Sequence, residues 1–329
     1  MRLGLLSTAR INGEVIRAAA TTDRVEVVAV ASRDGAKAHA YAREHGLERA
    51  HVGYEALLAD DAIDAVYISL PNGLHHEWSL RALAAGKNVL CEKPYSRHPA
   101  EVEGAFDAAA AADLVLMEGL MYRHHPQTRR VQELVAGGAI GALRAVRATF
   151  SFALHDLANA RALPELDGGA LMDVGCYCVS GARLLAGEPQ RASAERVLGS
   201  TGVDMALYGT LRHAENVVSQ LEASFVASRR QRLEAVGSDG TLVVEAPWRA
   251  DWGGDVVLRR DGSTETVPVE QADAYRLQLE NFADAIEGKA DPLLGRADAL
   301  GQARALAALS EAAQQGGVVT LRTGPELAA

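Results

Sequence analysis

Two short segments of the sequence hold residues suited to acid–base chemistry. Lys93 stands between Glu92 and Pro94, and Asp173 precedes Tyr177 by four residues. Oxidation of a secondary alcohol removes the hydroxyl proton while a hydride leaves the same carbon, so a base must lie beside the hydroxyl group. The ordinary pKa of tyrosine, ~10, is too high for this role at neutral pH, but a nearby ammonium favours the phenolate. Lys93 and Tyr177 could form such a pair, which in the reverse direction would protonate an alkoxide.

Each of these residues also has an ordinary structural interpretation. Taken alone, Lys93 is a surface lysine paired with Glu92, and Tyr177 is a half-buried packing residue. On a helix, Asp173 would face the same way as Tyr177 and could orient Lys93 or hold a substrate hydroxyl. It could equally satisfy backbone N–H groups at a helix N-terminus. The elements that position these residues therefore matter.

Residues 1–121 alternate short apolar runs with alanine-rich segments of helical period, which is typical of a parallel sheet wrapped by helices. Helices are expected over residues 36–45 and 76–85, each followed by a glycine. Strands buried on both faces are expected over residues 2–6, 25–31, 65–70, 88–91 and 114–117. The pattern predicts an α/β, doubly wound Rossmann domain over 1–121.

After Pro126 the pattern changes to a period of two, with Val146, Ala148 and Phe150 on one side of a strand. Asp261-Gly262 predicts a hairpin turn, and helices are expected over residues 275–287 and 297–313. Further strands are expected over residues 143–152, 192–198, 204–211, 217–225, 232–236, 242–245, 256–260, 265–269 and 318–322. Residues 122–329 are therefore predicted to form an α+β domain with a large, mostly antiparallel open sheet.

The turn after the first strand is a candidate phosphate site. A dinucleotide-binding fold carries Gly-x-Gly-x-x-Gly here, but Ser7, Ala9 and Asn12 occupy the three glycine positions. Hydroxyl groups and a helix N-terminus could still hold a pyrophosphate. An ordinary strand-turn-helix remains the alternative. The residues predicted to bind the cofactor here are Ser7, Thr8, Ala9, Arg10 and Ile11.

The end of the second strand bears on cofactor choice. Ser32 stands roughly where an acidic residue would hold the ribose of NAD, with Arg33 beside it and Lys37 one turn on. A carboxylate would repel a 2′-phosphate, whereas these cations would bind it. NADP is favoured, and Asp34 leaves NAD open.

Ligands of open α/β sheets bind beyond the carboxyl ends of the strands. The residues that follow the strands are therefore candidates to line a cofactor cleft, and Lys93 among them would lie beside a nicotinamide. The others are Leu70, Pro71, Asn72, Glu92 and Glu118.

Three segments resemble the Gfo/Idh/MocA oxidoreductase family, and the resemblance covers essentially the whole chain. They are Pro71-Asn72-Gly73-Leu74-His75, the run from Ala85 to Pro94 that ends in Glu-Lys-Pro, and the glycine-rich run from Asp167 to Tyr177. The resemblance implies that Lys93 is catalytic and that Pro71, Asn72, His75 and Glu92 line the cofactor cleft. It also implies a homodimer or homotetramer formed through the antiparallel sheet.

The tyrosine at position 177 resembles one branch of the family. That branch contains glucose-fructose oxidoreductase, dimeric dihydrodiol dehydrogenase, NADP-dependent xylose dehydrogenases and sugar 3-ketoreductases. Inositol dehydrogenases of the family have histidine there. Two features depart from the family: the glycine-poor first turn, and Asp167 where the first of three glycines is common.

Several other polar residues are weaker candidates. Arg123, Arg161 and Tyr275 could line the substrate end of the cleft, although a solvent-exposed arginine is the ordinary interpretation. His124 and His125 receive no role. Adjacent histidines point in different directions and lack an acidic partner at the usual spacing, so no metal site is expected.

Composition narrows the function classes further. The chain has 329 residues and a formal net charge of −10, with no long basic stretch, so neither nucleic acid nor a membrane surface is an expected partner. Three cysteines are too few for a disulfide framework, and no segment is apolar enough to span a membrane or serve as a signal peptide. We expect a cytoplasmic protein.

The leading hypothesis is an NADP-dependent oxidoreductase. It would transfer a hydride between nicotinamide and a secondary alcohol, ketone or hemiacetal carbon of a small carbohydrate-like substrate. The alternatives are an oxidoreductase of dihydrodiols or other non-sugar diols and carbonyls, and a non-catalytic NADP-binding regulatory protein.

Overall fold

The computed structural model describes residues 1–252 and 255–321, which form two compact units. The first comprises Met1–His124 together with Asp273–Leu300, and the second comprises His125–Ala272 and the chain from Gly301 on. Helix α9 (Arg296–Gln315) begins in the first unit and continues into the second. The segment 273–300, expected from the sequence in the C-terminal domain, thus packs with the N-terminal one.

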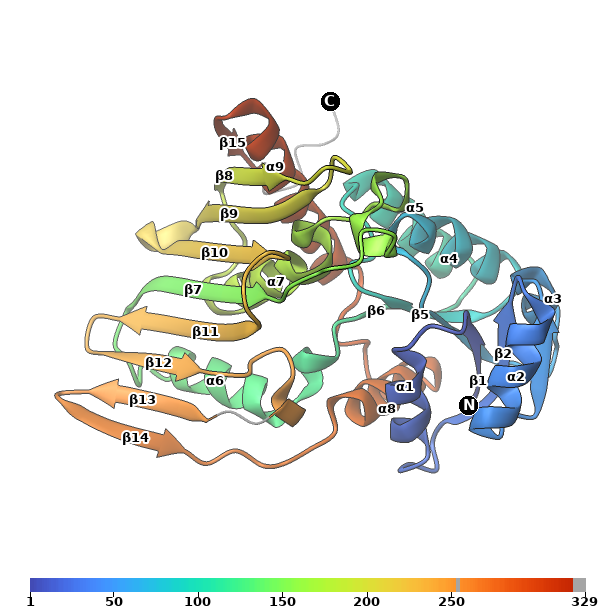
Figure 1. The fold of residues 1–329 in the computed structure, drawn as a ribbon. Coiled ribbons are helices and arrows are strands. Elements are labelled where there is room, and N and C mark those ends of the chain that lie inside the picture. The colour runs from blue at the N-terminus through green and yellow to red at the C-terminus, as the bar shows by residue number, and fades with distance from the viewer. Residues whose placement is uncertain (253–254, 322–329) are drawn as a thin grey trace. The chain divides into compact units, whose positions relative to one another are not determined.

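The first unit is built on a six-stranded parallel sheet of order β3-β2-β1-β4-β5-β6 (Figure 1). This is the strand order of a Rossmann fold, as predicted. The strands are β1 (Arg2–Leu6), β2 (Glu26–Ser32), β3 (Arg49–Val52), β4 (Ala65–Ile68), β5 (Asn88–Glu92) and β6 (Leu116–Gly119). β4 is buried along its whole length, as a strand covered on both faces must be.

The helices of the first unit begin and end at recognisable signals. Asp34 caps α2 by accepting the N–H of Lys37, and Gly46 ends that helix with a φ of 67°. The returning segment is tied to the sheet, because the carbonyl of Leu294 accepts the N–H of Glu118. The helices are α1 (Asn12–Ala19), α2 (Gly35–His45), α3 (Tyr54–Leu58), α4 (His75–Ala84), α5 (Pro99–Ala111) and α8 (Ala274–Ile286).

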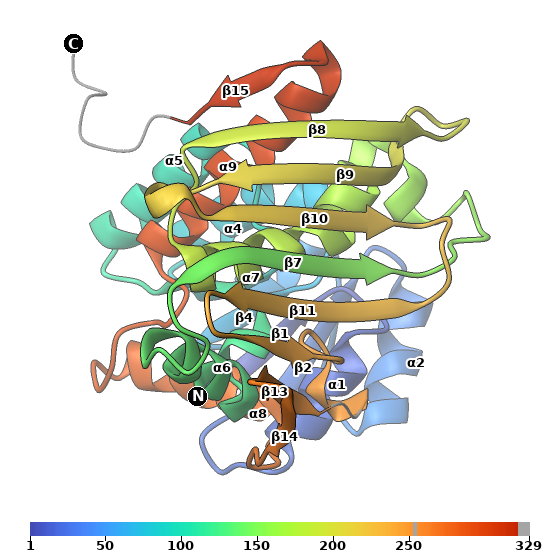
Figure 2. The ribbon, with the colours of Figure 1, turned by 90° about the vertical axis from the view of Figure 1, so that its left-hand side faces the viewer.

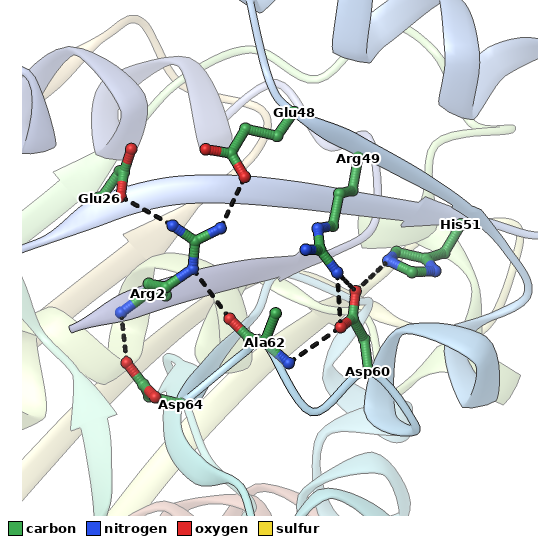
Figure 3. Close-up of polar contacts among 8 residues, drawn as sticks. All are labelled: Arg2, Glu26, Glu48, Arg49, His51, Asp60, Ala62 and Asp64. Carbon is green, nitrogen blue, oxygen red and sulfur yellow. Dashed lines mark hydrogen bonds and ion pairs between the residues drawn. The ribbon is translucent and has the colours of Figure 1, made fainter.

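Ion pairs hold the amino-terminal edge of this sheet. Arg2, which opens β1, contacts Glu26 of β2 at 3.2 Å and Glu48 at 2.6 Å (Figure 3). Arg49, which opens β3, contacts both oxygens of Asp60 at 2.8 Å. These contacts are exposed and lie at the edge where the strands begin, so we assign them to the fold.

The second unit contains a nine-stranded sheet of order β14-β13-β12-β11-β7-β10-β9-β8-β15. Neighbouring strands run antiparallel, apart from the parallel pair of β7 and β10. The mostly antiparallel sheet predicted from the period-two pattern is confirmed. The strands are β7 (Leu143–Ser151), β8 (Arg191–Leu198), β9 (Asp204–Arg212), β10 (Val218–Ser224), β11 (Arg230–Gly237), β12 (Gly240–Val244), β13 (Val256–Arg260), β14 (Ser263–Val267) and β15 (Val318–Thr320). The strand predicted over 318–322 ends earlier than expected, and Arg322 lies outside the described residues.

One face of this sheet packs against helices (Figure 2). They are α6 (Pro126–Ala136), α7 (Cys176–Ala186) and the second part of α9. Val146 and Ala148 of β7 are buried toward that side, while Arg147 between them is exposed. Asp261 and Gly262, with φ of 52° and 75°, join β13 to β14 as the predicted hairpin.

Candidate active site

The carboxyl ends of the parallel strands define one edge of the first unit. β1 and β4 are neighbours, but the chain leaves them toward opposite sides of the sheet, so the strand order reverses between them. Such a switch point is where open α/β sheets bind ligands. The turns that follow the strands at this edge contain most of the predicted cofactor residues.

The turn after β1 has Ser7, Ala9 and Asn12 at the usual glycine positions, and the side chains of Ser7 and Asn12 fix its shape. The Ser7 backbone has a φ of 146°, a region that glycine enters far more readily than serine. Its hydroxyl lies 2.8 Å from that of Ser69, beyond β4, and accepts the N–H of Ala9 at 3.0 Å. Asn12 donates to the Ser7 carbonyl at 2.7 Å. Thr8, Ala9 and Ile11 remain half-buried and Arg10 is exposed, so this side of the turn is open to a ligand.

The end of β2 presents two cations. Ser32 is buried, and its hydroxyl accepts the N–H of Asp34. The Asp34 carboxylate in turn accepts the N–H of Lys37 and caps α2. Asp34 is the acidic residue that could have bound the ribose of NAD, and its carboxylate is used here as a helix cap. Arg33 and Lys37 are exposed, and neither forms an ion pair with another residue of the described chain. This arrangement suits a phosphate group.

His75 links the turns after β4 and β5. Its ring nitrogens lie 2.8 Å from the carbonyl oxygen of Leu70 and 2.9 Å from that of Pro94. The residue is 1% exposed, and burial lowers the pKa of its imidazole to about 4, although the two carbonyl contacts oppose this shift. Pro71 and Asn72 lie half-buried in the segment that joins Leu70 to helix α4. A neutral ring carries one N–H and donates to only one of these carbonyls, while its other nitrogen lies close to the second, so the buried ring contacts both turns.

Glu92 positions the backbone of Lys93. The buried Tyr67 of β4 donates a hydrogen bond to Glu92 Oε1, and the N–H of Lys93 donates to Oε2 at 3.3 Å. Lys93 itself is half-buried. No local pattern indicated the role of Tyr67, because a tyrosine inside an apolar strand is usually a packing residue.

The glycine-rich segment of the second unit is fixed from β9. Asp204, at the start of that strand, accepts the N–H of Leu171 at 2.7 Å. Gly169 has a φ of 121°, and a side chain there would overlap the Asp204 carboxylate. Asp167 adopts the left-handed conformation with a φ of 55°, which aspartate tolerates better than most residues. Asp167 therefore supports a left-handed turn immediately before the two glycines.

Asp173 and Tyr177 follow on consecutive helical elements. Asp173 belongs to a π-helical turn, Leu171–Gly175, and Tyr177 to the first turn of α7. Arg161 donates through Nε to Asp173 Oδ2 at 2.7 Å. The Tyr177 ring is 7% exposed and packs against Phe150 and Trp248, with centroids 5.5 and 6.1 Å away. π-helical turns are rare and often occur at functional sites.

The remaining candidates are held in other contacts. Arg123 pairs with Asp298 at 3.0 Å, and Tyr275 is buried at the start of α8. His124 is buried too. His125 Nδ1 accepts the N–H of Gln127, and its Nε2 lies 3.1 Å from the Ala272 carbonyl. Among the described residues, no three or more His, Cys, Asp or Glu side chains gather in a way that could hold a metal ion.

The structure thus gathers two sets of candidates. The first unit brings the cofactor residues of β1, β2, β4 and β5 to one sheet edge. The second brings Arg161 onto Asp173, one helical turn from Tyr177. Lys93 and Tyr177 belong to different units, and their pairing stays a prediction.

A Rossmann domain joined to a large open sheet is an architecture that can bind a dinucleotide at the carboxyl edge of its parallel strands. Residues 1–120 match the oxidoreductase family described as having an NAD-binding Rossmann fold, and residues 128–243 match the GFO/IDH/MocA C-terminal domain. The chain belongs to the Gfo/Idh/MocA family, and the predicted resemblance and fold class are confirmed.

Relatives of known activity resemble the chain over most of its length. D-xylose 1-dehydrogenase (NADP(+)) 2 from Haloferax volcanii is 39% identical and aligns over 98% of this chain and 100% of its own. Trans-1,2-dihydrobenzene-1,2-diol dehydrogenase from Xenopus laevis is 33% identical over 73% of this chain and 74% of its own. A crystallised 3-ketoreductase from Actinomadura kijaniata, in complex with NADP and TDP-benzene, has a TM-score of 0.90 at 30% identity, over 95% of this chain and 97% of its own. All three are oxidoreductases, and the first and third carry NADP in their names.

Within the part of the chain that the structure describes, no helix has the length and apolar character needed to cross a membrane.

Proposed function

We propose that this protein is an NADP-dependent aldose dehydrogenase, which oxidises the hemiacetal carbon of a small sugar such as D-xylose. The choice of NADP rests on the residues at the end of β2. Exposed Arg33 and Lys37 lie beside the buried Ser32, and the carboxylate of Asp34 is used as a helix cap. The full-length similarity to an NADP-dependent xylose dehydrogenase supports the same cofactor and names the substrate class.

The residues of the first unit fit a dinucleotide. Arg33 and Lys37 would bind the 2′-phosphate, and the half-buried turn from Ser7 to Ile11, before α1, would hold the pyrophosphate. Leu70, Pro71, Asn72, Glu92 and Lys93 would line the nicotinamide end of the cleft, and the buried His75 would support the turns that carry them. When bound, the dinucleotide supplies a carbon that accepts or donates a hydride.

The chain's own residues would manage the proton. In the oxidative direction, Tyr177 takes the proton of the anomeric hydroxyl through its phenolate oxygen, while Lys93 stabilises that phenolate. The C1–H bond breaks as a hydride leaves, and the C1–O bond becomes the carbonyl of a lactone. Asp173 would accept a hydrogen bond from another substrate hydroxyl. In the reductive direction, Tyr177 returns the proton to the alkoxide.

A second activity is supported by the similarity to a dihydrodiol dehydrogenase. That enzyme's named substrate is a non-sugar diol whose carbon skeleton is apolar, so the two activities differ in the polarity that the substrate end of the cleft must recognise. A regulator that binds NADP without redox chemistry is the third outcome to be tested.

Turnover with a panel of substrates separates these functions. We expect absorbance of NADPH to rise with D-xylose or another aldose and NADP, and to rise more slowly with NAD. A response confined to diols would favour the second activity. NADP binding without turnover of any sugar, inositol, diol or carbonyl would overturn the proposal.

We also propose that the chain forms a homodimer or homotetramer in the cytoplasm. The sheet face opposite α6, α7 and α9 presents apolar Val197, Tyr208 and Val318, which the strand register places on one side and which are 52%, 49% and 55% exposed. Burying this face between copies would remove apolar surface from water. All three cysteines are free and buried, which suits a reducing compartment. Light scattering after size-exclusion chromatography tests the assembly, and Tyr208→Lys is expected to shift it toward the monomer.

A further inference from the structure

Arg161 is partly exposed, but its side chain is bonded to a mostly buried carboxylate of the glycine-rich segment. Its Nε donates to Asp173 Oδ2 at 2.7 Å, although 48% of the arginine side chain is exposed and only 11% of the aspartate side chain. An exposed ion pair that serves only the surface contributes little and is readily lost. This pair instead joins an exposed cation to a mostly buried carboxylate.

The backbone of Arg161 is fixed by its own loop and by the glycine-rich segment. Its N–H donates to the side chain of Asn159 at 3.1 Å, and its carbonyl accepts the N–H of Gly169 at 2.8 Å. The approach is so close that a Cβ atom at Gly168 would lie 2.5 Å from the Arg161 carbonyl oxygen. Three contacts therefore hold residue 161, two through its backbone and one through its guanidinium.

The segment that receives these contacts leads directly to the predicted base. Gly169 accepts the N–H of Asp173 at 3.0 Å, and Asp204 holds the N–H of Leu171. Asp173 and Tyr177 then follow on adjoining helical turns. The orientation of the Asp173 carboxylate is thus set by Arg161 on one side and by the π-helical turn on the other.

We infer that Arg161 is a positioning residue that acts through Asp173, and that the pair selects substrates with several hydroxyl groups over apolar diols. This inference rests on the proposed function. A guanidinium at this distance stabilises the charged form of a carboxylate, and a charged carboxylate is a stronger acceptor for a sugar hydroxyl than a neutral one. An apolar ring offers no hydroxyl to this carboxylate and would gain nothing from it.

Three variants test the inference: Arg161→Gln, Arg161→Lys and Asp173→Asn. Sugar affinity is measured by calorimetry on protein loaded with NADPH, and KM and kcat are measured with NADP. Arg130→Ala serves as the matched control, because Arg130 is 46% exposed and pairs with Glu133 in the same unit. A double variant, Arg161→Gln with Asp173→Asn, shows whether the two residues act as one.

We expect Arg161→Gln to weaken sugar binding and to raise the sugar KM by about tenfold, because an oriented, charge-assisted hydrogen bond is lost. kcat should change less, the KM for NADP should stay the same, and Arg161→Lys should recover part of the affinity. In the Asp173→Asn background, Arg161→Gln should add nothing. The sugar-over-diol preference should fall in every Arg161 variant, and Arg130→Ala should match the unsubstituted protein.

Two results would overturn the inference. One is equal sugar affinity and KM in the unsubstituted protein and Arg161→Gln. The other is an effect of Arg161→Gln that persists fully in the Asp173→Asn background. Absence of turnover by the unsubstituted protein contradicts the proposed function instead, and the calorimetric comparison still decides the role of Arg161.

Discussion

The Nδ1 atom of His75 lies 2.9 Å from the carbonyl oxygen of Pro94, the residue that follows Lys93. The contact crosses from the start of α4 to the turn after β5, and it is completely buried. Because the other ring nitrogen lies 2.8 Å from the Leu70 carbonyl oxygen, one imidazole contacts two of the turns at the predicted nicotinamide end of the sheet. The resemblance to the family predicted that His75 lines the cofactor cleft, whereas the structure shows its side chain buried between the turns after β4 and β5.

Stability should fall with acid because of this histidine. Burial lowers the folded-state pKa of His75 to about 4 from an ordinary value of 6.5. The unfolded chain therefore binds more protons between these values, and stabilisation that is present above pH 6.5 is lost as the pH falls toward 4. We expect about 2 kcal/mol of this loss between pH 7 and pH 5. Urea unfolding at both pH values measures it.

His75→Gln isolates this contribution, since glutamine does not titrate. The variant should be less stable at pH 7 but should lose about 2 kcal/mol less than the unsubstituted protein on acidification. His39→Gln, at an exposed histidine of α2, serves as the control and should behave as the unsubstituted protein does. An identical pH dependence in His75→Gln would show that the ring is not held neutral.

Cofactor preference should depend on the residues at the end of β2. Arg33→Ala removes a cation from the proposed 2′-phosphate site, so we expect the Kd for NADP to rise about tenfold while that for NAD is unchanged. Ser32→Asp adds a carboxylate at the same place and should reverse the preference toward NAD. Arg43→Ala, at an exposed arginine within α2, is the control. Fluorescence titration with both reduced dinucleotides measures the effect, and a parallel loss of NAD and NADP binding would refute a 2′-phosphate site.

The Asp204 carboxylate should stabilise the second unit. Asp204→Ala leaves the N–H of Leu171 without its charged acceptor, and we expect a loss of about 1–3 kcal/mol in the free energy of unfolding. Asp204→Asn keeps an acceptor oxygen and should lose less. Chemical denaturation measures both variants. Equal stability of Asp204→Ala and the unsubstituted protein would mean that this hydrogen bond is not needed to fix the glycine-rich segment.

The three thiols should resist modification. Cys91, Cys176 and Cys178 have no exposed surface, and burial raises the pKa of the Cys91 and Cys178 thiols well above the ordinary value. A colorimetric thiol reagent should detect no rapidly reacting thiol in the folded protein and three after unfolding in denaturant. Rapid reaction of any thiol under native conditions would contradict the packing described.

Strong local signals in the sequence predicted much of the fold. Gly46 marked the end of a helix and Asp261-Gly262 a hairpin, because each conformation depends on a few neighbouring residues. The polar, largely uncovered β3 and the alanine-rich α5 gave no such signal. In α5, alanines on several faces hide the helical period. The helical pattern over 275–287 was equally clear, but it could not show that α8 packs with the first unit.

Some residues of the candidate site could be predicted from local sequence patterns, and others could not. Lys93, Ser32 and the turn after β1 could be proposed because parallel strands bring their carboxyl ends to one edge. The contact of Arg161 with Asp173 depends on a loop that folds back onto a π-helical turn. No periodic pattern in the sequence predicts such a contact. Tyr67 and Asp204 act through hydrogen bonds to residues distant in sequence, so their roles emerged only from the structure.

The proposed chemistry requires the ammonium of Lys93 and the phenol of Tyr177 to act on one substrate carbon. Lys93→Ala and Tyr177→Phe should each retain NADPH binding, because neither removes a proposed phosphate contact. Each should lower kcat with D-xylose, or with whichever aldose is turned over fastest, by at least about a hundredfold, the scale of a lost general acid or base. Turnover near that of the unsubstituted protein in both variants, with NADP binding intact, would contradict a catalytic role for the two residues.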